Sequence, residues 1–167
     1  MLALKITDLK EFMNQLLIGT TFDQFELLTA DITTFNTFSI DGKIHQDFYD
    51  TDTSDILAQN KISYSSWKEI KPYCYSVIRG KRTPLSFKFV FQLPIRQILH
   101  IFQNQSGTLS PELITGMFLN LQFKNNALLC TTGISLKTFV PDKAPEQRWD
   151  EMVTEFLERH HILFERL

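Results

Sequence analysis

LSFKFVFQL, residues 85–93, is the clearest strand in the chain and the segment that decides the fold. Apolar and polar residues alternate along it, which is typical of a strand with one buried face. Pro94 follows at once, and proline is favoured as the first residue of a helix. The pattern therefore predicts a strand, then a helix, in a sheet whose apolar face is covered by helices. The residues expected on that face are Leu85, Phe87, Phe89, Phe91 and Leu93.

The other helices and strands follow from the same two periodicities. Thr7 is expected to cap the first helix and Gly19 to end it. On the last helix, Glu155 and Arg159 are four residues apart and are expected to pair on its exposed side. A polar break around Gly107 follows the helix that begins at Pro94. The expected helices lie in 7–19, 64–80, 94–102 and 144–161, and the strand-like runs are 2–6, 25–30, 32–40, 43–49, 116–124, 127–132 and 134–139.

Two dipeptides mark the turns between strands. Asp41-Gly42 is the strongest hairpin signal, because both residues tolerate the positive φ of a type I′ turn. Asn125-Asn126 is the second, and a two-residue turn there places Leu121 opposite Cys130. Residues 50–61 are polar and acidic and predict a loop.

The elements read as two halves, 1–80 and 83–160, each with the order β-α-β-β-β-α. Trp67 in the first half corresponds to Trp149 in the second, and the two hairpin turns correspond as well. An internal duplication is one interpretation. The other is that any α+β chain read this coarsely gives similar strings.

The predicted fold class is α+β, with one compact domain over 1–167, a curved antiparallel sheet and about four helices. Sliding DNA clamps and the TATA-binding saddle are similar in element order, since both contain tandem units of this kind. The chain carries no sequence motif of either family, so this similarity assigns no function.

The bulk composition indicates a folded cytoplasmic protein. The chain has 167 residues, of which 43% are hydrophobic, and a net charge of −2, which excludes disorder and any global attraction to nucleic acid or membrane. Two cysteines are too few for a disulfide framework and favour a reducing compartment. No apolar stretch reaches the length of a signal peptide core or a membrane span.

Catalytic and metal-binding motifs are absent from the sequence: it has no glycine-rich phosphate loop, no G-x-S-x-G, no H-E-x-x-H and no C-x-x-C. The acidic run from Asp47 to Asp55 fails as an EF-hand. Counted from Asp50, the sixth position is Asp55 instead of glycine and the twelfth is Lys61 instead of glutamate. We therefore expect no metal and no cofactor.

The Asp41-Gly42 hairpin defines the candidate catalytic site. A two-residue turn pairs Asn36 with Asp47 and places both on one face with His45 and Tyr49. Cross-strand neighbours lie about 4.5–5.5 Å apart, and a carboxylate beside an imidazole is how a general base is built. The alternative is a sheet face open to water, where such residues are ordinary.

Two further groups invite functional interpretations. Arg79, Lys81 and Arg82 form the densest basic cluster, which is either a phosphate or nucleic-acid contact or simply a cationic helix end. Cys74 and Cys130 fall on apolar faces and are expected to be buried and inert.

The chain ends with His160-His161 and an apolar tail, 162–164. The histidines are expected at the surface, at the end of the last helix. The tail must pack either on its own sheet or on a second chain, and the second alternative predicts a homodimer.

Four stretches carry a family resemblance: ITTFNTFSIDG (32–42), GKRTPLSFKFV (80–90), CTTGISLKTF (130–139) and WDEMV (149–153). Together they resemble a family of uncharacterised proteins from clostridia-type Firmicutes, many from gut bacteria. The resemblance covers nearly the whole chain and implies a bacterial, cytoplasmic protein. It implies no activity, substrate or catalytic residue.

Two functions remain at this point. The first is a non-catalytic binding module for a protein or nucleic-acid partner, because the core is well patterned and a curved sheet offers a binding surface. The second is a small-molecule hydrolytic enzyme that uses His45 and Asp47. The relative position of these two side chains is the geometric test of the second.

Overall fold

In the computed structural model, which describes residues 1–103 and 110–167, β4 (Ser86–Gln92) lies inside a seven-stranded sheet. The strand order is β3-β2-β4-β5-β6-β1-β7, and every pair of neighbours is antiparallel. The other strands are β1 (Ala3–Ile6), β2 (Glu26–Thr33), β3 (Thr37–Asp41), β5 (Ile114–Lys124), β6 (Ala127–Leu136) and β7 (Phe164–Arg166). The predicted α+β class with a curved antiparallel sheet is confirmed. Gly107 lies outside the described residues.

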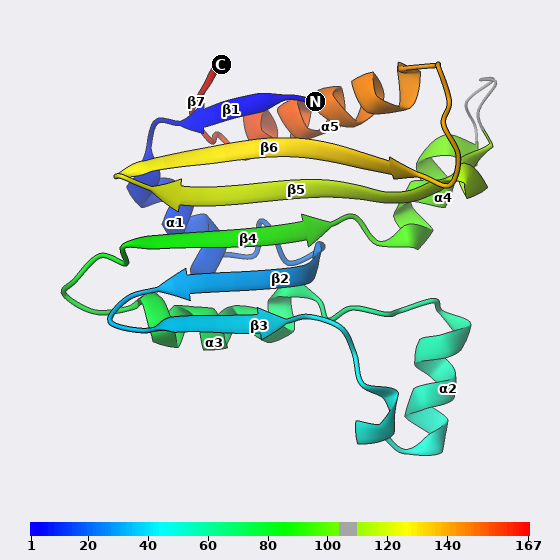
Figure 1. The fold of residues 1–167 in the computed structure, drawn as a ribbon, viewed down its shortest axis with the longest axis horizontal. Coiled ribbons are helices and arrows are strands. Elements are labelled where there is room, and N and C mark those ends of the chain that lie inside the picture. The colour runs from blue at the N-terminus through cyan, green and yellow to red at the C-terminus, as the bar shows by residue number, and fades with distance from the viewer. Residues whose placement is uncertain (104–109) are drawn as a thin grey trace.

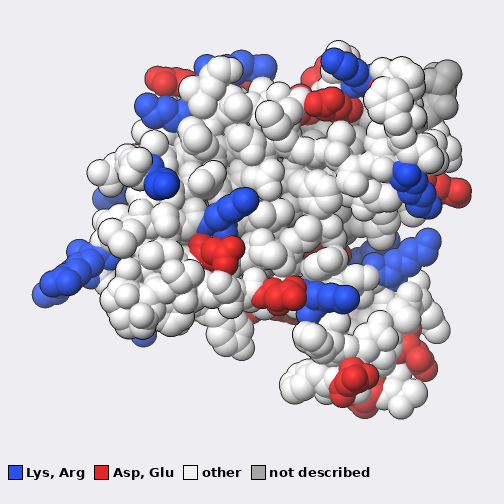
Figure 2. Space-filling model, viewed as in Figure 1, with Lys and Arg blue, Asp and Glu red and all other residues white. Residues whose placement is uncertain are grey.

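The helices cover one face of the sheet and leave the other open (Figure 1). The α-helices are α1 (Leu9–Leu17), α2 (Thr51–Gln59), α3 (Trp67–Ile78), α4 (Ile95–Gln103) and α5 (Ala144–Arg159), and the 3-10 helices are η1 (Gln46–Phe48) and η2 (Pro111–Leu113). The open face presents mostly uncharged side chains, with a few scattered charges (Figure 2). Among the helices in 1–103 and 110–167, none has the length and apolarity needed to cross a bilayer.

The core lies between the helices and the apolar face of the sheet. Phe87, Phe89 and Phe91 of β4 point into it, as the alternation predicts. Leu85 does not: it precedes the strand and is 71% exposed, so its predicted inward position is wrong. Trp67 of α3 is fully buried, with its ring 5.2 Å from Phe89.

The turn at Asn125-Asn126 forms as predicted. Both residues have positive φ, and Lys124 pairs with Ala127 across the turn. Leu121 then faces Cys130, the register that the sequence indicated. One boundary differs, because the runs 127–132 and 134–139 are not separate strands: β6 continues through Gly133 to Leu136.

The predicted hairpin at Asp41-Gly42 is wrong. The chain turns earlier, at 34–36, so that β3 pairs with β2 and Thr33 faces Thr37. This register places Ile40 beside Ala30 on the core side of the sheet. Residues 43–49 form no strand but lead into η1. The pairing of β3 along β2, with Ile40 packed against the core, outweighs the local preference of the Asp-Gly pair.

Residues 50–61, predicted as a loop, contain α2. The Asp50 carboxylate caps this helix by accepting a hydrogen bond from the Thr53 N–H at 2.7 Å, and its interactions with the side chain and the backbone of Thr53 lower the Asp50 pKa. No residue of α2 is buried, and its sequence lacks the apolar stripe by which most helices are recognised. The sequence pattern therefore does not indicate a helix here. It projects away from the sheet (Figure 1).

Near the chain ends, the structure differs slightly from the predictions for the first helix and decides between the two alternatives for the tail. Asp8 instead of Thr7 caps α1, which ends at Leu17 with Ile18 as its C-cap. The apolar tail packs on its own sheet: Ile162 is buried and β7 pairs with β1.

Corresponding strands of the two halves have different neighbours in the sheet. β4 pairs with β5, whereas β1, its counterpart in the first half, pairs with β6 and β7 instead of β2. The last predicted strand of each half is not a separate strand: 43–49 forms none, and 134–136 belongs to β6. The internal duplication stays a prediction.

A partly buried ion pair fixes the segment that joins α1 to β2. Lys71 of α3 donates through Nζ to the Asp23 carboxylate and to the Gly19 carbonyl oxygen, each at 2.7 Å. Both charged side chains are less than one-fifth exposed. Removing one partner of a buried pair is costly, because the other charge is left desolvated and unpaired.

We expect Gly42→Ala to lower the free energy of unfolding by about 2 kcal/mol or more, measured by urea denaturation. A Cβ atom on Gly42 would lie 1.8 Å from the Leu27 carbonyl oxygen, which is backbone and cannot move aside cheaply. Gly133→Ala is the matched control, since its Cβ would meet only ordinary contacts at 3.9 Å. Equal stabilities of the two variants would contradict the observed path of the chain at Gly42.

We expect Lys71→Met to lower the free energy of unfolding by about 2–3 kcal/mol, somewhat less than for a fully buried pair. In a double-mutant cycle with Asp23→Asn, the coupling should reach about 1–2 kcal/mol. Lys68→Met, at an exposed position of the same helix, should be close to neutral. A coupling near zero would mean that the pair does not hold the segment.

Candidate functional site

The basic cluster lies where α3 ends and the chain turns back toward β4. Arg79 is the C-cap of α3, and Gly80 has a φ of 141°, a backbone conformation that side-chain-bearing residues rarely adopt. The sequence interpretation of a cationic helix end is therefore consistent with the structure. Basic side chains protrude in Figure 2 at the edge where Figure 1 places this loop.

The same loop also walls a cavity of about 230 Å³, which we call the basic-loop cavity. Lys81 and Arg82 supply its only charged lining groups within the described residues. Its apolar lining comes from α1, α3, β4 and β5, elements far apart in the chain. The complete lining is Leu9, Met13, Leu17, Ile78, Gly80, Lys81, Arg82, Thr83, Pro84, Phe87 and Phe123.

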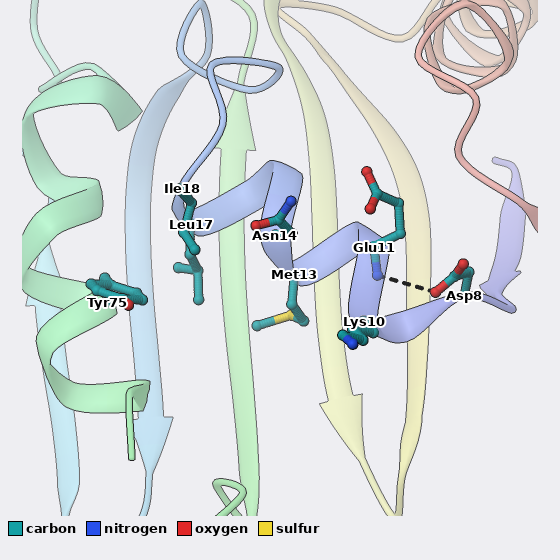
Figure 3. A pocket seen from close by; sticks show the side chains of 8 residues that line it. All are labelled: Asp8, Lys10, Glu11, Met13, Asn14, Leu17, Ile18 and Tyr75. Atoms are coloured by element: carbon teal, nitrogen blue, oxygen red, sulfur yellow. Dashed lines mark hydrogen bonds between the residues drawn. The ribbon is translucent and has the colours of Figure 1, made fainter. Parts of the chain in front are cut away.

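A shallow groove continues from this cavity along α1, because Met13 and Leu17 line both hollows. The groove has a volume of about 610 Å³ and is drawn in Figure 3. Met13 and Leu17 project from α1 toward α3, and Tyr75 projects from α3 toward α1 (Figure 3). We call the two hollows together the α1–α3 groove.

The polar side of the groove carries charges of both signs. Asp8, Lys10 and Glu11 line it, and the Asp8 carboxylate accepts a hydrogen bond from the Glu11 N–H at 3.1 Å (Figure 3). Apolar groups remain uncovered beside it, since Ile18 is 62% exposed. The arrangement is an apolar channel with acidic groups along α1 and an exclusively basic end at the loop.

The structure does not form the catalytic face predicted around the hairpin. His45 is the N-cap of η1, Asp47 and Tyr49 follow within and after that helix, and Asn36 sits in the turn between β2 and β3. All four side chains are exposed. The predicted pairing of Asn36 with Asp47 is wrong because 43–49 is not a strand, so the geometric basis of the hydrolase hypothesis is lost.

The two cysteines are buried, as predicted, and are not disulfide-bonded. Burial raises the pKa of each thiol to about 12, because the thiolate would lose its hydration. A thiol with so high a pKa is a poor nucleophile and metal ligand at neutral pH. In the described part of the chain, no group of three or more His, Cys, Asp or Glu side chains converges as a metal site.

Sequence reasoning missed the apolar half of the site. Met13 and Leu17 lie on the predicted apolar face of α1, where they read as ordinary core residues. The signal that could have revealed the groove was the width of the apolar face of α1, because Ile18 extends that face beyond the part that packs against the core. Tyr75 gave no signal, since one aromatic residue on a helix surface is common.

The chain belongs to DUF5721, a family of unknown function, whose match covers residues 15–165. The predicted similarity to an uncharacterised family is therefore confirmed. No curated protein and no solved structure matches the chain.

Both thiols should resist alkylation by iodoacetamide at pH 8, with modification followed by mass spectrometry, and both should react once urea unfolds the chain. Because the folded-state pKa lies above the unfolded value, their contribution to stability is present below about pH 9 and is lost as the pH rises toward 12. Rapid alkylation of either cysteine in the folded protein would contradict its burial.

Proposed function

We propose that this protein is a non-catalytic binding module of the bacterial cytoplasm that receives a segment of a partner protein in the α1–α3 groove. The segment places an apolar side chain in the basic-loop cavity and an acidic group against Lys81 and Arg82. The observation that carries the proposal is the composition of that cavity: an apolar floor with two cations and no acidic side chain among its lining residues.

An apolar cavity attracts an apolar group because burial removes hydrocarbon surface from water, worth roughly 25 cal/mol per Å². The cavity volume of about 230 Å³ is below the roughly 300–1,000 Å³ typical of small-molecule pockets. It therefore suits a single anchoring side chain better than a whole ligand. The adjoining groove gives the rest of the segment a surface on which to lie.

The charges specify the direction of the segment. Lys81 and Arg82 at the loop favour an acidic group at one end, and an arginine fork binds a carboxylate in a planar, bidentate manner. In the adjoining groove, Asp8 and Glu11 outnumber the one cation, Lys10, and disfavour a second acidic group there. Charge complementarity thus supports an apolar segment that is acidic at one end only.

A protein partner fits this surface better than nucleic acid. A phosphate backbone needs an extended run of cations, and binding of single strands adds aromatic stacking platforms. The groove instead carries both acidic and basic groups, and Tyr75 is the only exposed aromatic residue in its described lining, because Phe87 and Phe123 are buried. The net charge of −2 adds no long-range attraction for nucleic acid.

Fluorescein-labelled peptides with one leucine or phenylalanine anchor and an acidic end should bind saturably in fluorescence polarisation. Lys81→Glu with Arg82→Glu should weaken binding at least ~10-fold, because attraction becomes repulsion. Met13→Glu, which charges the apolar floor, should weaken it similarly. Lys68→Glu with Lys88→Glu, at two exposed positions outside the groove, changes the net charge by the same amount and should leave the affinity unchanged.

Two comparison probes make the outcome decisive. Peptides in which lysine replaces the acidic group should bind the wild-type protein poorly and the Lys81→Glu, Arg82→Glu variant better. Labelled single-stranded DNA is the other probe. Saturable binding of the DNA but not of the acidic peptides, or no saturable peptide binding at all, would refute a protein-binding groove.

A further inference from the structure

A second hollow lies at the opposite end of β4, between α4 and α5. It has a volume of about 260 Å³, and its polar lining groups are Gln24, Gln97, Arg148, Glu155 and Arg159. Its apolar lining comes from Phe25, Leu93, Trp149, Met152, Val153 and Phe156. We call it the α4–α5 cleft. It shares no lining residue with the α1–α3 groove.

The spacing of residues along α5 builds one wall of this cleft. Arg148, Glu155 and Arg159 recur at intervals that keep them on one face of a helix. At a rise of 1.5 Å per residue, the two arginines are separated by roughly 16 Å along the axis. Long side chains from both ends nevertheless line the same hollow.

The hydrogen-bonding groups of Arg148 are only partly satisfied. Its Nη1 atom lies 3.5 Å from the Glu151 carboxylate and 3.7 Å from that of Glu155. Its Nε atom is buried and, within the described residues, has no hydrogen-bond acceptor. A buried donor without an acceptor costs about 1–3 kcal/mol, so a ligand oxygen at this position would be stabilised.

Arg159 adds a second cation to the cleft, beside the Arg148 guanidinium that Glu151 and Glu155 partly compensate. The pair expected between Glu155 and Arg159 does not form, because Glu155 lies toward Arg148. In residues 1–103 and 110–167, Arg159 has no salt-bridge partner. The cleft therefore carries two guanidinium groups against one carboxylate.

A second basic hollow adjoins the cleft, since Gln24 and Gln97 line both. It has a volume of about 540 Å³ and includes Arg96 and His100 of α4. Burial raises the pKa of the Glu26 carboxyl, and the positive charge of the nearby Arg96 opposes that effect. The same carboxyl accepts a hydrogen bond from the Gln92 amide at 2.7 Å. Arg96 thus has an acidic neighbour, whereas Arg148 and Arg159 supply the positive charge in the cleft itself.

We propose that the α4–α5 cleft binds the oxyanion of a small molecule, a phosphate or a carboxylate, which accepts hydrogen bonds from Arg148 and Arg159, while the rest of the molecule extends into the adjoining hollow of about 540 Å³. Guanidinium groups match the planar acceptor pairs of both anions. The amides of Gln24 and Gln97 supply further donors, and the aromatic floor accepts an apolar part of the ligand. This site is independent of the α1–α3 groove, and either can fail without the other.

The two tryptophans provide an internal reporter and control. Trp149 lines the cleft, and its indole N–H donates to the Phe118 carbonyl oxygen at 2.9 Å. Trp67 lies in the core, where its indole N–H donates to the Leu16 carbonyl oxygen at 2.8 Å. In a ¹⁵N–¹H spectrum each indole gives one resonance, so local binding and general salt effects are distinguishable in one sample.

The experiment titrates the protein with inorganic phosphate and, separately, with acetate, each at constant ionic strength maintained with chloride. We expect saturable shifts of the Trp149 indole and of the Arg148 Nε–H, with the Trp67 indole unmoved. Tighter binding of phosphate identifies a phosphate-bearing ligand, and tighter binding of acetate a carboxylate-bearing one. Absence of saturation with both anions, or equal shifts of both indoles, overturns the proposal.

Variants test the assigned roles in opposite directions. Arg148→Lys keeps the charge but removes the Nε donor and should weaken binding at least tenfold. Arg159→Gln should weaken it too, whereas Glu155→Gln should tighten it severalfold by removing repulsion. Arg166→Gln, in β7 outside the cleft, is the control. An unchanged Trp67 resonance verifies folding of each variant, and tight binding by Arg148→Lys or weaker binding by Glu155→Gln refutes the assignment.

Discussion

The hydrogen bond from the Trp67 indole to the Leu16 carbonyl oxygen sets the spacing of the helical layer. It is 2.8 Å long, fully buried and joins α3 to the last turn of α1. The same ring lies 5.0 Å from Phe91, so the two helices and β4 meet at one side chain. Because large aromatic groups occupy this contact, α1 and α3 cannot close completely along their length, and the α1–α3 groove is the remaining space.

The parts of the fold that the sequence predicts are those in which local and tertiary preferences agree. β4 alternates strictly, and the aromatic residues on its inner face bury as the alternation requires. Asn125-Asn126 adopts positive φ, and the register across β5 and β6 follows from it.

Where local and tertiary preferences disagree, packing against the core determines the structure. Asp41-Gly42 has the stronger turn signal, yet Ile40 reaches the core only if β3 pairs with β2. Gly42 is needed for a different reason, the close approach of the Leu27 carbonyl.

The candidate site is less predictable than the fold, because its residues are neighbours only after the sheet has assembled. Lys81 and Arg82 are visible in the sequence as a basic cluster beside the glycine that ends α3. Their apolar counterpart includes Leu9 from α1 and Phe123 from β5, and no local pattern connects these segments. The two interpretations of the cluster do not exclude each other, since a helix end and a cavity wall can use the same residues.

β4 connects the two hollows, because Phe87 near its start lines the basic-loop cavity and Leu93 just after its end lines the α4–α5 cleft. In both hollows, the long side chains of lysine and arginine can cover apolar surface with their stems. In a chain of net charge −2, cationic side chains near both ends of one strand create local fields opposite in sign to the whole molecule. A ligand at one end is about a strand length from the other, beyond the Debye length of roughly 8 Å at physiological salt. Coupling between the two sites would need a structural change between them, and the close packing of the aromatic rings along β4 leaves little room for two arrangements. We expect the two sites to bind independently and their variants to have additive effects.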